Sequence, residues 1–336
     1  MTQLTNLVQF PGLGLSFHLN RVAFSIGGVH IYWYGVCIAV GLCLALVFAF
    51  RHSIEFGVDP DGMVDVILIG VVLGIVSARA YYVAMAPFKY QSIWEMIAIR
   101  DGGLAIYGGV IMAVVVLLVF CKVRQIRFLA FADLGVFGML IGQMIGRWGN
   151  FVNIEAYGGP TELPWRMGIY AYVDGVRQYM EVHPTFLYES LWNLAGLGLL
   201  LFVISKGRRF DGENTWFYFL WYGLGRFWIE GLRTDSLYLF NWTFLGQPIR
   251  VSQALSLLLA VTAAVMLFYN IKIKKHSRDE LLVNQVAAEA AEGTAEADIS
   301  TAEAGESVPA GQEEPELPQP PETQNGEGGE TDGNTH

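Results

Sequence analysis

Long apolar runs alternate with short polar segments over most of this chain. Crossing the hydrocarbon core of a bilayer takes about 20 mostly apolar residues in an α-helix. Runs of this kind predict seven membrane-spanning helices, numbered here as spans 1 to 7, of which spans 3, 4 and 6 are short or interrupted. The predicted spans are Ile31–Phe50, Met63–Met85, Leu104–Phe120, Leu129–Ile145, Thr185–Ile204, Thr215–Glu230 and Val251–Ile271.

The segments outside these spans divide the chain into an arm, a membrane domain and a tail. Residues 1–30 lack the basic start and short apolar core of a cleavable signal, so we expect an external amino-terminal arm. Residues 31–275 form the predicted membrane catalytic domain. Its segment from about 147 to 184 is rich in aromatic and polar residues and predicts a small external head between spans 4 and 5. The predicted fold class is an all-α polytopic membrane protein.

Composition supports a membrane domain and separates it from the tail. Hydrophobic residues make up 53% of the chain and charged residues only 15%, whereas soluble domains carry about 25% charged residues. The net charge of −10 is concentrated in the last part of the chain, because residues 277–336 hold fifteen acidic residues and one arginine. Residues 276–336 have almost no large apolar side chains, so we expect a disordered acidic cytoplasmic tail.

The distribution of lysine and arginine predicts the orientation of the spans, because short cytoplasmic loops are enriched in both. With seven spans, basic residues after spans 1, 3, 5 and 7 all fall on one side, while the opposite loops carry fewer, with Lys89 and Arg100 between spans 2 and 3. This places the amino terminus outside and the carboxyl terminus in the cytoplasm. The residues on the cytoplasmic side are Arg51, Lys122, Arg124, Arg127, Lys206, Arg208, Arg209, Lys272, Lys274, Lys275 and Arg278.

Metal and nucleotide chemistry is not indicated. Cys37, Cys43 and Cys121 lie in apolar runs or at the end of one, without a CxxC motif, and read as small packing residues. The sequence has no HExxH motif, Walker loop or histidine cluster. We therefore expect no metal, no cofactor and no nucleic-acid partner.

Span 4 ends in an unusual group of polar residues. Gly138, Gly142 and Gly146 recur every four residues and predict a smooth stripe that lets another helix backbone approach closely. Directly after this stripe come an arginine, two asparagines and a glutamate among further glycines. Charged residues at membrane depth are costly and are functional candidates by default. These residues are Arg147, Asn150, Asn153 and Glu155.

Span 6 carries a second group. Tyr222, Arg226, Glu230 and Arg233 are four, four and three residues apart, which puts them on one face of a helix. Two arginines on one stripe suit a phosphate, which a guanidinium can bind with two parallel hydrogen bonds. The alternative is an internal Arg226–Glu230 ion pair that only stabilises helix packing.

Further polar residues lie at the outward ends of other spans. These are Tyr34 in span 1, Arg79 in span 2, Tyr107 and Gly108 near the start of span 3, and His183 before span 5. Alternatives are an interfacial aromatic belt for Tyr34, close helix packing for the glycines near Tyr107, and a structural contact for His183. Together these residues indicate chemistry or transport at the outer leaflet. A transporter or lipid flippase is the competing class, although no internal repeat is visible.

The segment from Gly146 to Gly158 resembles the signature of prolipoprotein diacylglyceryl transferases, G-R-x-G-N-F-x-N-x-E-x-x-G, at every fixed position. The resemblance covers about residues 20–275 and implies seven spans in the bacterial cytoplasmic (inner) membrane. It also implies transfer of a diacylglyceryl group from phosphatidylglycerol to the lipobox cysteine of a prelipoprotein signal peptide at the outer leaflet. A thioether forms and glycerol phosphate leaves. Supporting matches are Tyr32–Gly35, Asp101–Gly103, Tyr107–Gly109, His183–Pro184, Tyr188–Glu189 and Tyr222–Arg233.

The resemblance implies roles for the polar residues named above. Arg147 and Arg226 are expected to stabilise the leaving phosphate, with Asn150 and Arg233 binding the phosphatidylglycerol headgroup. Their positive field would favour the substrate thiolate over the thiol, whose free pKa is about 8.5.

Other positions are expected to complete this site. Glu155 and Glu230 would hold the arginines or accept a proton, Tyr34 would line the headgroup pocket, and Gly108 and Gly158 would permit close approach of the lipid. Tyr107 stands where some family members carry a histidine often proposed as the base. Since a tyrosine with a pKa near 10 is a poor base at neutral pH, we assign no general base.

Overall fold

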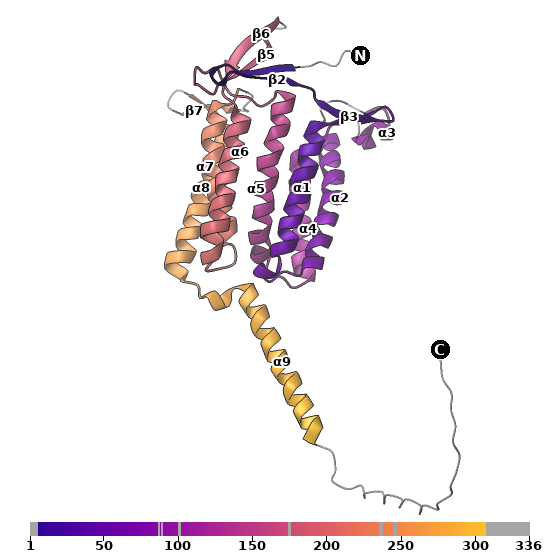
Figure 1. The fold of residues 1–336 in the computed structure, drawn as a ribbon, viewed down its shortest axis with the longest axis vertical. Helices are drawn as coiled ribbons and strands as arrows, with labels where there is room; N and C mark the ends of the chain where they lie inside the picture. The colour runs from indigo at the N-terminus through magenta and orange to yellow at the C-terminus, as the bar shows by residue number, and fades with distance from the viewer. Residues whose placement is uncertain are drawn as a thin grey trace, which may run out of the picture. The chain divides into compact units, whose positions relative to one another are not determined.

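The computed structural model describes residues 6–86, 88, 90–99, 102–173, 176–234, 238–244 and 247–306. Lys89, Arg100 and Asp101 lie outside the described residues. The chain divides into two compact units, Met1–Glu289 and Ala290–His336. The first unit holds a bundle of long helices with short strands at one end (Figure 1).

Each predicted span overlaps a helix of this bundle. Among the described residues, six helices are long and apolar enough to cross a membrane. Helix α7 is also 20 residues long but is not among the six; it is less apolar, with Arg226 and Glu230 inside it and Glu213 at its start. The prediction of a helical polytopic membrane protein is confirmed. The bundle helices are α1 (Trp33–His52), α2 (Pro60–Met85), α4 (Ile106–Val123), α5 (Phe128–Asn153), α6 (Thr185–Leu199), α7 (Glu213–Leu232) and α8 (Val251–Phe268).

The outward faces of the bundle are apolar. Leu68, Val72 and Val76 on α2 are each more than half exposed. In water, an apolar surface of this extent would lead to aggregation, whereas lipid tails cover it without cost. The bundle is therefore built to be surrounded by a bilayer.

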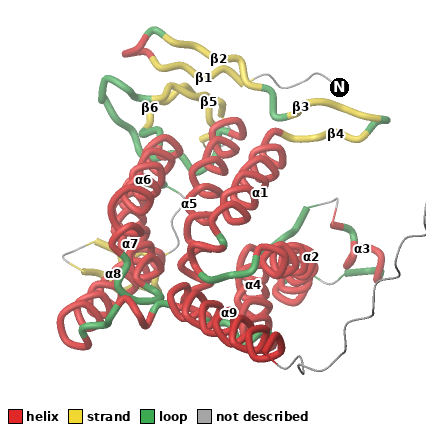
Figure 2. The backbone as a smooth tube through the Cα atoms, turned by 60° about the horizontal axis from the view of Figure 1, so that its bottom comes forward, coloured by secondary structure: helices red, strands yellow, loops and turns green. Residues whose placement is uncertain are grey.

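Glycines set the closest helix contacts. A Cβ atom added to Gly41 on α1 would lie 3.3 Å from the Cα atom of Gly142 on α5, and one added to Gly138 would lie 3.3 Å from the Cβ atom of Ala45. This confirms that the glycine stripe of span 4 receives another helix. Figure 2 shows the resulting arrangement: α2 and α4 on one side, α6, α7 and α8 on the other, and α1 with α5 between them.

A buried carboxylate on α5 holds the start of α7. Asp133 accepts hydrogen bonds from the backbone N–H groups of Gly212 and Thr215, each at 2.8 Å, and from the Thr215 hydroxyl at 2.8 Å. The first N–H groups of a helix have no partner within the helix, and an Asp side chain can satisfy them. Here the capping residue comes from another helix, so the cap also joins α7 to α5.

The head is a four-stranded antiparallel sheet with strand order β2-β1-β5-β6. The sequence pattern predicted a head but no strands. Gln9 in the amino-terminal arm pairs with Gly168, so the sheet joins the arm to the segment between α5 and α6. Two small hairpins, β3–β4 and β7–β8, lie outside this sheet. The strands are β1 (Asn6–Phe10), β2 (Leu15–Leu19), β3 (Val22–Ile26), β4 (Val29–Tyr32), β5 (Met167–Val173), β6 (Val176–Val182), β7 (Tyr238–Phe244) and β8 (Gln247–Arg250).

Short helical segments complete the chain. α6 continues through η4 (Leu200–Ile204) and η5 (Ser205–Gly207), and α8 continues through η6 (Tyr269–Lys274). The others are η1 (Pro11–Leu13), η2 (Ile54–Phe56), α3 (Ile93–Ile97) and η7 (Arg278–Glu280).

The tail differs from the expected disorder in its first part. Residues Leu282–Glu306 form helix α9, and residues 307–336 lie outside the described residues. The α9 sequence is rich in Ala and Glu, which have high intrinsic helix propensity. A helix can therefore form here although few large apolar side chains are present to bury.

Candidate active site

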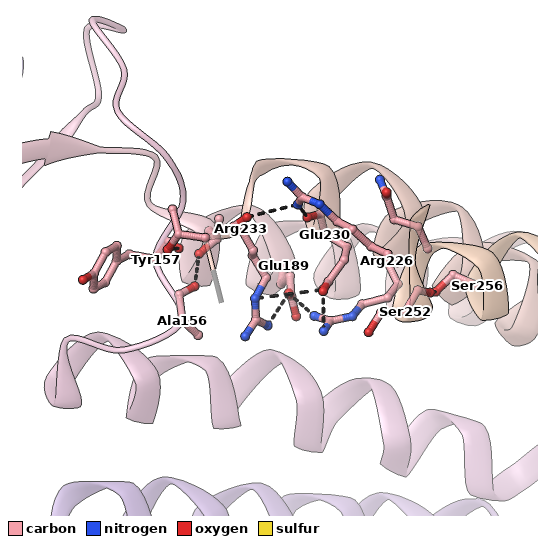
Figure 3. Close-up of polar contacts among 12 residues, drawn as sticks. Ala156, Tyr157, Glu189, Arg226, Glu230, Arg233, Ser252 and Ser256 are labelled. Carbon is pink, nitrogen blue, oxygen red and sulfur yellow. Dashed lines mark hydrogen bonds and ion pairs between the residues drawn. The ribbon is translucent and has the colours of Figure 1, made fainter. Parts of the chain in front are cut away.

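Charged side chains from α5, α6 and α7 meet in one place, which we call the arginine–glutamate cluster. It consists of Arg147, Glu189, Arg226, Glu230 and Arg233. Figure 3 shows the four members from α6 and the end of α7. The Glu189 carboxylate receives Arg147 on one oxygen; its other oxygen lies 3.0 Å from Arg226 Nη1 and 4.0 Å from Arg233 Nη1. One Glu230 oxygen lies 2.6 Å from Arg226 Nη2 and 4.0 Å from Arg233 Nε. Arg226 therefore bridges the two glutamates.

The cluster is buried enough to need internal pairing and open enough to bind a ligand. Glu189 and Glu230 are only 7% and 2% exposed, and buried charges are stable only when paired. The three arginine side chains retain 12–24% exposure. Three arginines against two glutamates leave an excess positive charge. Such a site favours an anion.

Arg250, the residue directly before α8, adds to this positive charge. Its guanidinium donates to the Glu230 carbonyl and, at 3.0 Å, to the Arg233 carbonyl. The carbonyls at the end of a helix lack partners within the helix, and a cation there is favoured by the helix dipole. Arg250 thereby stabilises the end of α7, where Arg233 begins the next segment.

A pair of tryptophans aligns α6 with α7 beside the cluster. The Trp192 indole N–H donates to the Trp221 carbonyl, and the Trp221 indole N–H donates to the Trp192 carbonyl, each at 2.9 Å. The rings stack at 4.3 Å, and Gly196 and Gly225 leave the space that they occupy. Trp192 is three residues after Glu189 and Trp221 five before Arg226, so this contact fixes how the two charges meet.

The end of α5 brings the signature residues together. Arg147 Nη1 donates to Asn150 Oδ1 at 3.3 Å, and Asn150 Nδ2 donates to Glu155 Oε1 at 2.7 Å. Ile154 adopts a left-handed conformation with φ of 52°, which ends the helix and turns Glu155 back toward Asn150. Glu155 therefore contacts the cluster through Asn150, and Asn153 Nδ2 also donates to it at 3.4 Å.

Tyr34 and Gly158 lie beside the cluster's helix ends. A Cβ atom on Gly149 would lie 2.5 Å from the Tyr34 ring, so the ring rests on the last turns of α5. Gly158 donates its N–H to the His183 carbonyl at 3.0 Å and pairs with Arg233 as an isolated bridge. A Cβ atom at Gly158 would lie 2.6 Å from that of His183. Glycine is required there by the backbone packing itself.

His183 makes a structural contact with the start of α6. Its Nδ1 atom lies 3.2 Å from the Tyr188 hydroxyl. Burial lowers the pKa of the His183 imidazole below its usual value, because the charged form loses hydration. This burial favours the neutral form of the imidazole.

Tyr107 and Gly108 contact α2, not the cluster, in the interactions recorded for the described residues. They lie in the first turn of α4, and α4 packs beside α2 (Figure 2). Tyr107 is 65% exposed and its ring lies 6.4 Å from that of Tyr81. A Cβ atom at Gly108 would lie 2.4 Å from the Ser77 carbonyl oxygen, so Gly108 allows α2 and α4 to pack.

Arg79 orders the loop between α2 and α4. Its guanidinium donates to the carbonyls of Glu95 and Gly102 at 2.6 Å, Met96 at 2.8 Å and Gly103 at 3.1 Å. These acceptors satisfy a guanidinium that is only 7% exposed. The geometry gives Arg79 a structural role.

Two residues of the site were not predicted as site residues. Glu189 occurs among the supporting matches of the sequence analysis but received no role, although a carboxylate inside a predicted span is itself a functional signal. Arg250 directly precedes span 7 and was not singled out. Only the folded chain shows that both reach the same cluster.

The fold and site define a polytopic membrane protein with an electropositive site at the sheet end of its helical bundle. The chain belongs to the prolipoprotein diacylglyceryl transferase family, whose model matches residues 21–269. It is thus a transferase, and a multi-pass protein of a bacterial inner membrane.

Relatives cover almost the whole membrane domain. The chain is 43% identical over 258 residues to the phosphatidylglycerol–prolipoprotein diacylglyceryl transferase of Finegoldia magna, covering 76% of this chain and 97% of that protein. It is 39% identical over 263 residues to the protein of the same name from Clostridioides difficile, covering 78% and 100%. It is 42% identical over 270 residues to that of Bacillus anthracis, covering 78% and 96%.

Proposed function

We propose that this protein transfers the diacylglyceryl group of phosphatidylglycerol to the lipobox cysteine of bacterial prelipoproteins, the first step of lipoprotein maturation. The sulfur of the cysteine attacks the phosphate-bearing carbon of the glycerol that carries the two acyl chains. The bond between that carbon and the phosphate oxygen breaks. The products are a thioether and glycerol phosphate, and the thiol proton is released. The electropositive arginine–glutamate cluster is the observation that carries this proposal, together with relatives named for that reaction.

The arginines are suited to the change in charge during the reaction. The donor phosphate carries one negative charge as a diester and two as the departing monoester at neutral pH, so negative charge grows on its oxygens. Arg147 and Arg226 are held in advance by Glu189, which removes the cost of organising them during the reaction. Arg233 and Asn150 would contact the remaining headgroup oxygens.

The same positive field acts on the attacking thiol. A thiolate is the reactive form, and nearby cations lower the pKa of a cysteine thiol. Glu155, linked to Arg147 through Asn150, is placed to hold this arrangement or to accept the proton. Tyr107 is a poor base at neutral pH, so we give it no role as a base.

We place the cluster at the outer leaflet. The loop charges support this orientation, because Arg51, Lys122 and Lys206 lie at or beyond the ends of α1, α4 and α6, at the end of the bundle opposite the sheet (Figure 1). The amino terminus and the head would then face outward, and the tail would be cytoplasmic. A prelipoprotein signal peptide would reach the site from the outer leaflet.

Mass spectrometry of a lipobox peptide tests the reaction. Purified protein in detergent, phosphatidylglycerol and the peptide should give a cysteine with one added diacylglyceryl mass. A Cys→Ser peptide and the Arg226→Ala variant should both give none. If folded wild-type protein yields no adduct, the proposal fails and transport of a lipid becomes the better explanation, since a transporter cannot act without compartments.

A further inference from the structure

A second group of basic side chains surrounds a cavity at the end of the bundle opposite the sheet. The cavity has a volume of about 230 Å³ and lies between η2, the α6–α7 loop and the segment that leads into α9. Ligand pockets for organic molecules usually measure about 300–1,000 Å³. This cavity suits a smaller group.

Arg208 is the buried charge of this cavity. Its side chain is 5% exposed, and its guanidinium lies over the Phe56 ring at 4.2 Å. One long hydrogen bond, 3.4 Å, joins Nη2 to the Glu55 carbonyl. Within the described part of the chain, Nη1 has no hydrogen-bond partner and lies 3.9 Å from the carboxylate of Asp133. A buried guanidinium with free donors is costly unless a ligand fills them.

Asp133 does not supply hydrogen-bond acceptors for the guanidinium of Arg208. Its two oxygens already accept three hydrogen bonds from Gly212 and Thr215 at the start of α7. At 3.9 Å the contact with Arg208 is an ion pair without a hydrogen bond. The guanidinium therefore brings a buried positive charge to the lining of the cavity, and few of its donors are hydrogen-bonded within the described residues.

The remaining lining is positive and polar. Lys206 and Arg278 add two exposed cations, Glu55 adds one acid, and Ser205 and Asn284 add neutral hydrogen-bonding groups. With Arg208, whose charge is partly balanced by Asp133, the lining carries more positive than negative charge and suits a phosphate. Guanidinium groups bind phosphate oxygens with two parallel hydrogen bonds.

We propose that this cavity binds a phosphate group, carried either by an anionic lipid headgroup of the adjacent leaflet or by a free phosphate. Basic pockets between helices on the cytoplasmic side of membrane proteins bind lipid headgroups in this way. The site is separate from the arginine–glutamate cluster, so it does not depend on the proposed transfer reaction.

Binding would also link the bundle to the segment that begins the tail. This segment is already held by Asp211, which accepts from the Leu282 N–H at 3.0 Å, and by Arg127, which donates to Gln285 at 2.7 Å. Arg278 belongs to the segment and Arg208 to the bundle. A phosphate between them would strengthen that attachment.

Two titrations of the purified full chain in neutral detergent distinguish the sources of phosphate. All variants carry Arg226→Ala, which weakens binding at the cluster. Inorganic phosphate is followed by the rise in unfolding temperature, and phosphatidic acid by native mass spectrometry of bound lipid. Adding Lys206→Gln and Arg278→Gln should weaken binding about tenfold or more, because two charge-assisted contacts are lost. Both side chains are exposed, so folding should be retained.

The matched control adds Lys272→Gln and Lys274→Gln, which remove the same charge from exposed positions that do not line the cavity. The control should bind like the Arg226→Ala parent. Selective weakening with inorganic phosphate identifies a free phosphate site, and selective weakening with phosphatidic acid alone identifies a headgroup site. Equal binding by the two double substitutions, or no binding by the parent, overturns the proposal.

Discussion

An arginine followed four residues later by a glutamate occurs near each end of α7: Arg209, which precedes the helix, with Glu213, and Arg226 with Glu230. The Arg209 side chain is 46% exposed, and among the described residues its recorded partner is Glu213 alone. Arg226 is 17% exposed and contacts Glu189 of α6 as well as Glu230. The same local spacing gives a simple pair at one end and part of a multi-helix cluster at the other. Neighbouring helices, not spacing, make the difference.

The largest effect should come from Arg226→Gln. Its guanidinium bridges two glutamates and is proposed to stabilise the departing phosphate, so its loss should lower the transfer rate about 10²–10³-fold. Arg209→Gln, at the equivalent spacing, should keep the rate within about twofold because Arg209 lies at the end of α7 opposite the cluster. It should lower the unfolding temperature, since the buried Glu213 loses its cationic partner. Diacylglyceryl transfer to a lipobox peptide measures both rates. If both variants lost similar amounts of transfer rate, the contacts of Arg226 with the cluster would not explain its role in the reaction.

Glu189→Gln should lower the transfer rate next most strongly, by roughly 10–100-fold. The amide keeps the shape of the carboxylate but removes the charge that holds Arg147 and Arg226, and buried charges that lose a partner rearrange. The unfolding temperature should also fall. Glu181→Gln removes the partner of Arg166 in the sheet and serves as control. A Glu189→Gln enzyme with an unchanged turnover number would contradict the positioning role.

Gly108→Ala tests whether Gly108 serves the packing of α2 against α4 or contacts the lipid substrate. The added Cβ atom would lie 2.4 Å from the Ser77 carbonyl, and overpacking of this kind costs about 1–3 kcal/mol. We expect a lower unfolding temperature with an unchanged KM for phosphatidylglycerol. Gly70→Ala, where no atom lies within 4 Å, should not destabilise. A raised KM at normal stability would instead place Gly108 in the lipid site.

Trp192→Phe should have the smallest effect. It removes one of two reciprocal hydrogen bonds between α6 and α7, which contributes about 0.5–1.5 kcal/mol, and should lower the turnover number several-fold by loosening the approach of Glu189 to Arg226. Trp216→Phe changes an indole that packs on Phe219 in the same helix and should leave turnover unchanged. Equal effects would show that the reciprocal contact does not align the cluster.

Much of the architecture was predictable because single segments determine it. Length and hydropathy locate the spans, and the glycine stripe from Gly138 to Gly146 predicts the close approach of α1. Strands were missed because they are short, and the pairing that joins the arm to the head is distant in the chain: Gln9 meets Gly168. The helical start of the tail was missed because a shortage of large apolar residues indicates that little surface is buried. It does not exclude a helix made of Ala and Glu.

The sequence by itself determined the membrane location, the spans, the signature from Gly146 to Gly158 and the polar stripe of α7, since each depends on residues close together in the chain. The tertiary structure alone decided that Glu189 joins the cluster, that Arg250 reaches the end of α7 beside it and that Gly108 packs against α2. It also showed that the Arg226–Glu230 ion pair, the alternative considered for span 6, is present and is extended by a contact with Glu189. The physical reason is that a buried charge is stabilised by whichever partners the folded helices bring within a few ångströms, and spacing along one helix cannot specify them.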